Sequence, residues 1–156
     1  MRTTDEDIGL CVDLLSKATV GIQIDRKTLE KTLKAQNIIT LLAKVEEKVV
    51  GMVSGLVFPS MIPPPRIEFL SVLDEESARK GLHSLLIDEF IEELKRRLPN
   101  AKFVDTNISV ANSQLIIIYS LKGFVIAGFT KGEPPFVDAV VLRKNISKET
   151  SVDYAV

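Results

Sequence analysis

Apolar residues recur every three or four positions in four parts of the chain, and this spacing predicts four helices. The first covers about 5–17, and the second begins at Asp25. The third is long and ends near Leu98. The fourth is short and lies between Asn112 and Gly123, which are residue types typical of a helix start and a helix stop.

Six runs rich in β-branched and aromatic residues predict strands. They cover 38–45, 49–58, 66–73, 102–109, a run from Phe124, and 136–143. Gly51 and Gly55 inside the second run indicate a bulge or a close backbone approach.

The order of these elements predicts the topology. Only the step from the third strand, through the long helix, to the fourth strand requires a parallel crossover, because the hairpins imply antiparallel neighbours. The expected fold class is therefore α/β: a mixed, mostly antiparallel sheet with one parallel βαβ crossover and helices on both faces.

Length and charge narrow the class of protein. A chain of 156 residues predicts one domain, here 1–146, followed by a frayed tail at 147–156. The 20 basic and 21 acidic residues leave a net charge of −1, which argues against a nucleic-acid binder. No apolar run reaches the roughly 18–20 residues that cross a bilayer, and no signal peptide opens the chain. We expect a cytoplasmic protein without a membrane partner.

The chain has one cysteine, Cys11, and one histidine, His83. An intrachain disulfide is therefore impossible, and a structural zinc site is not expected. Any chemistry must use carboxylates, hydroxyls, backbone amides or an organic cofactor.

Tyr119 is a candidate catalytic group. It lies seven residues after Asn112, so two helical turns place both on one side of the short helix. A phenol held there can pass a proton to a nearby leaving group. The alternative is a tyrosine that simply packs in the core.

Glu68 is the second candidate. Strict alternation along 66–73 would place Arg66, Glu68, Leu70 and Val72 on one face of the strand. A carboxylate among apolar neighbours can act as a general base near neutral pH. The alternative is an ion pair with Arg66.

The junction before the long helix is a candidate anion site. Backbone amides at such a junction and the helix dipole both favour a phosphate, and Gly81 would allow close approach. A rival interpretation begins the helix at Asp74 and leaves Gly81 inside it, at a cost of about 1 kcal/mol.

Five segments, in this order, resemble the GNAT acetyltransferase superfamily over nearly the whole chain. The match at Asn112–Phe124, with its Asn…Tyr…Gly-Phe spacing, is the most specific of them. The others are Met1–Asp7, Glu46–Gly51, Ile67–Val72 and Arg79–Leu86.

The resemblance implies acetyl-CoA as co-substrate, no metal, and a small-molecule or peptide amine as acceptor. Leu70 and Val72 would bind the pantetheine arm through their backbone, and Asn112 would hold that arm or the local backbone. Tyr119 would face the thioester sulfur, Glu68 would deprotonate the amine, and a backbone N–H near Val72 would stabilise the oxyanion. The pyrophosphate would be surrounded by Arg79, Lys80, Gly81, Leu82, His83 and Ser84. A homodimer is possible by analogy.

Two residues depart from the family pattern. Ala78 stands where the family has glutamine or arginine, and His83 replaces a second glycine or alanine. The imidazole could obstruct the phosphate, donate a hydrogen bond to it, pack, or take part in catalysis. These departures keep a second hypothesis open: a non-catalytic binding or interaction module on the same fold.

Overall fold

The computed structural model describes residues 37–57, 64–73, 75, 81–133 and 137–147. The helices predicted for 5–17 and from Asp25, and the end of the predicted tail, lie outside this part of the chain. Three expectations therefore stay predictions: helices on both faces of the sheet, a single domain at 1–146, and a frayed tail at 147–156.

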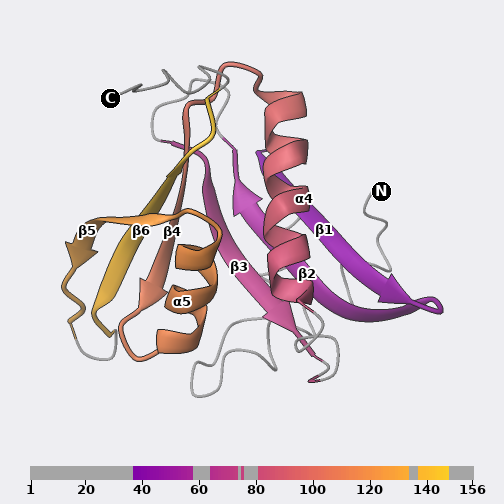
Figure 1. The fold of residues 1–156 in the computed structure, drawn as a ribbon, viewed down its shortest axis with the longest axis horizontal. Helices are drawn as coiled ribbons and strands as arrows, with labels where there is room; N and C mark the ends of the chain where they lie inside the picture. Colours follow the sequence, from indigo (N-terminus) through magenta and orange to yellow (C-terminus); the bar gives the residue numbers. More distant parts are fainter. Residues whose placement is uncertain (1–36, 58–63, 74, 76–80, 134–136, 148–156) are drawn as a thin grey trace, which may run out of the picture.

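The described residues form one six-stranded sheet and two helices of several turns (Figure 1). The strand order across the sheet is β1-β2-β3-β4-β6-β5, and only β3 and β4 are parallel. This confirms the predicted mixed sheet with one parallel crossover. The elements are β1 (Ile38–Val45), β2 (Lys48–Leu56), β3 (Arg66–Val72), α4 (Leu82–Arg97), β4 (Phe103–Ser109), α5 (Ser113–Leu121), β5 (Val125–Thr130) and β6 (Ala139–Asn145).

The predicted last strand, 136–143, is placed about two residues too early. Val137 and Asp138 are not in a strand, because Asp138 closes the preceding loop: its carboxylate accepts the Gly132 amide at 2.8 Å. The strand continues to Asn145, since β6 pairs along the whole of β4 as far as Phe103.

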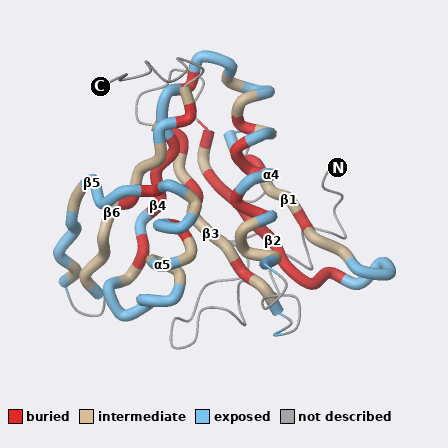
Figure 2. The backbone as a smooth tube through the Cα atoms, in the orientation of Figure 1, coloured by how far each residue is buried: buried red, intermediate tan, exposed pale blue. Residues whose placement is uncertain are grey.

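Helix α4 lies across β1, β2 and β3 and buries one apolar side against them, whereas α5 packs on β4. Both helices share one core cluster and so cover the same face of the sheet (Figures 1 and 2). Glycines let α4 approach β2 closely. A Cβ on Gly55 would lie 2.5 Å from the Phe90 ring, and one on Gly51 would lie 3.1 Å from Leu82. The predicted close backbone approach is confirmed.

A bulge interrupts the pairing of β2 with β3. Ser54 pairs with Phe69 and Gly55 pairs with Ile67, so Glu68 has no partner on β2. The bulge reverses the alternation: Ile67 on one side of Glu68, and Leu70 on the other, both belong to the core face. The predicted grouping of Glu68 with Leu70 and Val72 on one face is therefore wrong.

No helix among the described residues is both long enough and apolar enough to cross a membrane.

Candidate functional site

The site begins where β3 and β4 separate. These parallel strands pair only at Arg66 with Asp105 and at Ile67 with Thr106. At the point of separation the Thr106 hydroxyl donates to the Ile67 carbonyl at 3.1 Å. Beyond it β3 stays paired with β2 and β4 stays paired with β6. A gap therefore opens between two central strands of the sheet.

The backbone of β3 faces this gap at alternate residues. The Leu73 amide donates to the Val50 carbonyl at 2.9 Å. This bond shows which residues of β3 are hydrogen bonded to β2. Along an antiparallel pair, every second residue hydrogen bonds to the partner strand, and the backbone N–H and C=O of the residues between them point away from it. The amides and carbonyls of Leu70 and Val72 therefore point away from β2, towards the gap. These are the backbone groups that the resemblance implies for pantetheine, and that role stays a prediction.

Two cavities occupy the gap and continue into each other. The first, of about 320 Å³, lies towards the start of α4, and the second, of about 240 Å³, lies towards the point where the strands separate. Both are lined by Leu70, Ser71, Asn112 and Leu115. The first also includes Val72, Leu73, His83, Gln114 and Ile118, and the second includes Glu68, Phe69, Thr106, Asn107, Ile108, Ser109 and Tyr119.

Gly81 is the N-cap of α4 and has a φ of 84°, the left-handed region that favours glycine. The rival interpretation that places Gly81 inside the helix is wrong. No side chain caps the first turn, whose residues include Leu82, His83 and Ser84. Their amides are thus available to an anion. Arg79, Lys80 and Ala78 lie outside the described residues.

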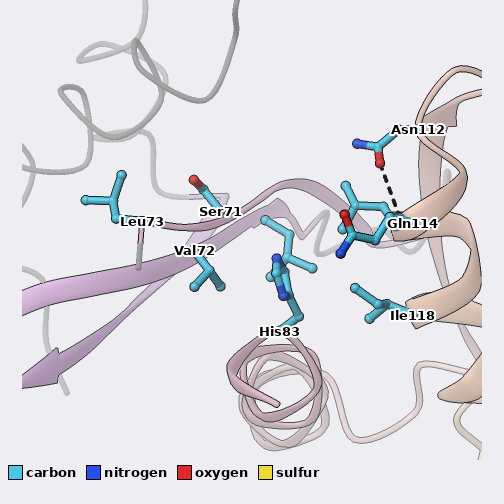
Figure 3. A pocket seen from close by; sticks show the side chains of 9 residues that line it. Ser71, Val72, Leu73, His83, Asn112, Gln114 and Ile118 are labelled. Carbon is cyan, nitrogen blue, oxygen red and sulfur yellow. Dashed lines mark hydrogen bonds between the residues drawn. The ribbon is translucent and has the colours of Figure 1, made fainter. Parts of the chain in front are cut away.

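His83 reaches from α4 into the first cavity, between β3 and α5 (Figure 3). Burial lowers the pKa of His83, so the imidazole is neutral near pH 7. Gln114 lies opposite it, at the start of α5 (Figure 3). His83 therefore lines the groove, where it narrows the path towards Val72.

Asn112 acts as the predicted helix cap. Its side-chain oxygen accepts the Leu115 amide at 3.2 Å, shown as a dashed line in Figure 3. Gly123 follows α5 with a φ of 89°, as expected for a helix stop. These two residues fix both ends of the helix that carries Tyr119.

Tyr119 is almost fully buried, yet it lines the second cavity. Its ring packs edge-to-face on Phe124 at 5.0 Å, and its hydroxyl is hydrogen bonded to the Thr106 side chain. The Thr106 hydroxyl donates its only proton to the Ile67 carbonyl. The phenol is therefore the donor in the bond between Tyr119 and Thr106. Burial raises the pKa of Tyr119 well above its usual value. The phenol is both a core side chain and part of the gap, so the two sequence alternatives are not exclusive.

Glu68 forms the ion pair that was the alternative to a catalytic role: its partner is Arg66. A second pair lies beside it, where Arg143 donates to both carboxylate oxygens of Asp105 at 2.8 and 2.9 Å. The role of Glu68 as general base stays a prediction.

Thr106, Asn107 and Gln114 are site residues that the sequence did not single out. Their place in the gap depends on the parallel register of β3 and β4, which no local pattern specifies. Thr106 carries no local signal, because it stands between two other polar residues, Asp105 and Asn107. Within the described residues, no group of three potential ligands could hold a metal ion.

Solved structures share this architecture. The chain matches the ribosomal-protein-alanine N-acetyltransferase from Brucella melitensis with a TM-score of 0.75 and 21% identity, covering 94% of this chain and 98% of that one. It matches a GNAT-family acetyltransferase from Streptococcus pneumoniae with a TM-score of 0.72 and 22% identity, at the same coverage. A third match, Arabidopsis thaliana NAA60 in complex with a bisubstrate analogue, has a TM-score of 0.73 and 14% identity, covering 94% and 98% of the two chains.

Compared by sequence, the chain matches no protein-family model and no curated protein. The structural matches extend over nearly the whole of each chain at low identity. They show that this chain has the GNAT fold.

Proposed function

We propose that the protein is an acetyl-CoA-dependent N-acetyltransferase that moves an acetyl group to a primary amine. The observation that carries this proposal is the gap between β3 and β4. There, Leu70 and Val72 of β3 direct backbone groups that are not paired with β2 towards the two neighbouring cavities, and Leu70 shares the second of these with Tyr119. An extended, amide-containing arm bound along β3 would complete the broken ladder.

Two parts of the described chain suit such a co-substrate. The uncapped first turn of α4 suits a diphosphate, and the backbone of Leu70 and Val72 suits the amides of the arm. Leu115, which lines both cavities, and Ile118, which lines the first, would pack against the apolar parts of the arm.

Tyr119 would act at the leaving sulfur. Because its pKa is raised, full proton transfer to a thiolate is uphill, so the phenol would serve best as a hydrogen-bond donor while the C–S bond breaks. For this role the Tyr119 hydroxyl must turn from Thr106 towards the sulfur, or share its proton between Thr106 and the sulfur. A backbone N–H near Val72 remains the candidate donor to the oxyanion.

Titration of the purified protein with acetyl-CoA, followed by its melting temperature, tests the proposal. We expect the melting temperature to rise with cofactor concentration, because a ligand that binds only the folded state stabilises it. His83→Gly, measured in parallel, should increase the shift if the imidazole obstructs the groove. No shift at millimolar acetyl-CoA for either protein would refute cofactor binding.

The non-catalytic module is the second candidate, and the observation behind it is the His83 side chain in the groove. Tyr119→Phe separates the two functions. An enzyme would lose turnover with this variant, whereas a binding module would keep its partner affinity and change only in stability.

A further inference from the structure

His83 combines two features that concern a bound anion. It lies in the uncapped first turn of α4, two residues after Gly81, where backbone N–H groups have no partner within the helix. Its half-buried side chain reaches into the first cavity, between β3 and α5 (Figure 3). An anion bound to the amides of this turn would therefore lie beside the imidazole.

The walls around the imidazole are uncharged. The cavity residues contributed by β3 and by the α5 region all have neutral side chains: Leu70, Ser71, Val72, Leu73, Asn112, Gln114, Leu115 and Ile118. Along α4, the described ionisable residue nearest to His83 in the chain is Asp88, which is paired with Lys122 at 2.7 Å. Arg79 and Lys80, which precede the helix, keep their positive charge up to about pH 9.

In these surroundings the imidazole is held in its neutral form. Burial lowers the pKa of His83 below its usual value of about 6.5, so the free protein carries no charge there near pH 7. A diphosphate beside the ring would reverse this preference, because a nearby negative charge favours the imidazolium ion. The protonated ring donates from both nitrogens, and its hydrogen bonds to phosphate oxygens are about twice as strong as those between neutral groups.

We infer that acetyl-CoA binding is linked to the uptake of one proton by His83, so that the protein binds the cofactor more tightly as the pH falls. This inference rests on the proposed function. The proton comes from solvent and joins a ring nitrogen, and the imidazolium ion then attracts the diphosphate. A glycine or alanine at this position could not take up a proton, so this response to pH belongs to the departure from the family pattern at His83.

The linkage has a definite sign. A ligand that raises the pKa of a group binds best to the protonated protein. Affinity is therefore highest below the pKa of His83 in the free protein. It falls as the pH rises from that value to the higher pKa of the complex, and it is constant above both. Each unit between the two pKa values corresponds to about a tenfold change in Kd.

Proton NMR measures the pKa of His83 directly, because His83 is the only histidine of the chain. In a protein without a histidine tag, one imidazole signal is followed from pH 5 to pH 9. We expect a pKa below 6.5 in the free protein, and a pKa at least about one unit higher with saturating acetyl-CoA. An unchanged or lower pKa in the complex would overturn the inference.

S-Acetylpantetheine separates the diphosphate from the arm. This compound carries the arm and the thioester but no phosphate, so it can only bury the imidazole further. We expect it to leave the pKa of His83 unchanged or to lower it. A rise equal to that with acetyl-CoA would overturn the role of the diphosphate.

His83→Gln tests the effect on affinity, because glutamine forms hydrogen bonds but does not titrate. Calorimetry gives the Kd for acetyl-CoA at pH 5.5, 6.5 and 7.5. The 3′-phosphate of the cofactor titrates near pH 6 and affects both proteins alike. Between pH 7.5 and pH 5.5 the wild type should therefore gain about tenfold more affinity than the variant.

Two negative results have different meanings. Parallel pH profiles of the two Kd values would overturn the linkage at His83 and leave the proposed function standing. Absence of a melting shift with millimolar acetyl-CoA in both proteins, at all three pH values, would refute the proposed function itself.

Discussion

Tyr119 shows how one side chain can serve the core and the gap together. Its ring packs on Phe124, and its hydroxyl ends at Thr106, where β3 and β4 separate. The hydroxyl is thereby held at the floor of the second cavity. Because burial disfavours the phenolate, the group keeps its proton over the whole physiological pH range.

This burial predicts a pH-dependent stability. Unfolded Tyr119 ionises near pH 10, whereas the folded residue keeps its proton, so the unfolded state binds fewer protons at high pH. The free energy of unfolding of the wild type should therefore fall relative to Tyr119→Phe as the pH rises above about 10. Below that pH the variant should be the less stable protein by about 1 kcal/mol, through loss of the bond to Thr106.

Urea unfolding of both proteins at pH 7, 9 and 10.5 measures this difference. A difference that stays constant across the three values would contradict the burial of an ionisable phenol.

At the scale of elements, the contact of α4 with β2 supports the site. Phe90 lies directly on Gly55, and the carbonyl of Arg66 lies 2.4 Å from where a Cβ on Gly55 would be. That carbonyl belongs to β3 beside the bulge at Glu68. Tight packing at Gly55 therefore holds the part of β3 from which the gap opens.

Gly55→Ala should destabilise the fold by about 1–3 kcal/mol, because the added methyl group forces Phe90 and the β3 backbone to move. Gly128→Ala is the matched control. Its Cβ would lie 3.7 Å from Val141, an ordinary contact, so its effect should stay within about 0.5 kcal/mol. Urea unfolding measures both, and equal effects would contradict the close packing of α4 on β2.

At the scale of the whole molecule, β5 is an edge strand that carries large exposed apolar side chains. Ile126 is 70% exposed and Phe129 is 60% exposed. They pair with Leu142 and Val140 of β6, which belong to the core cluster or pack against it. Most of β5 is coloured as exposed in Figure 2. Edge strands of monomers usually carry charges that prevent pairing, and β5 has none. This strand is where we expect the homodimer to form.

Light scattering coupled to size exclusion should give a mass of two copies for the wild type and of one copy for Phe129→Lys. Acetyl-CoA binding should be the same in both. Leu121→Lys, at an 81% exposed position on α5, is the control and should remain dimeric. A monomeric wild type would contradict the predicted dimer.

Much of the fold follows from local patterns in the sequence. Strand β1 has the predicted bounds, and Asn112 and Gly123 delimit α5 as expected, because capping and left-handed turns depend on a few adjacent residues. The order of the elements along the chain also predicted the single parallel pair of strands, β3 with β4. For the candidate site, the resemblance named residues of β3, α4 and α5 that line the two cavities, and their roles stay predictions.

Only the tertiary structure decided which groups meet in the gap. The bulge at Glu68 depends on the register of β2 against β3, and it moved Leu70 and Val72 to the core face. The pairing of Glu68 with Arg66 and the bond between Tyr119 and Thr106 depend on that register or on distant strands. The same holds for the presence of Ser71 and Asn107 in one cavity. Local spacing specifies neither a bulge nor the point at which two parallel strands part, because both depend on packing across the whole sheet.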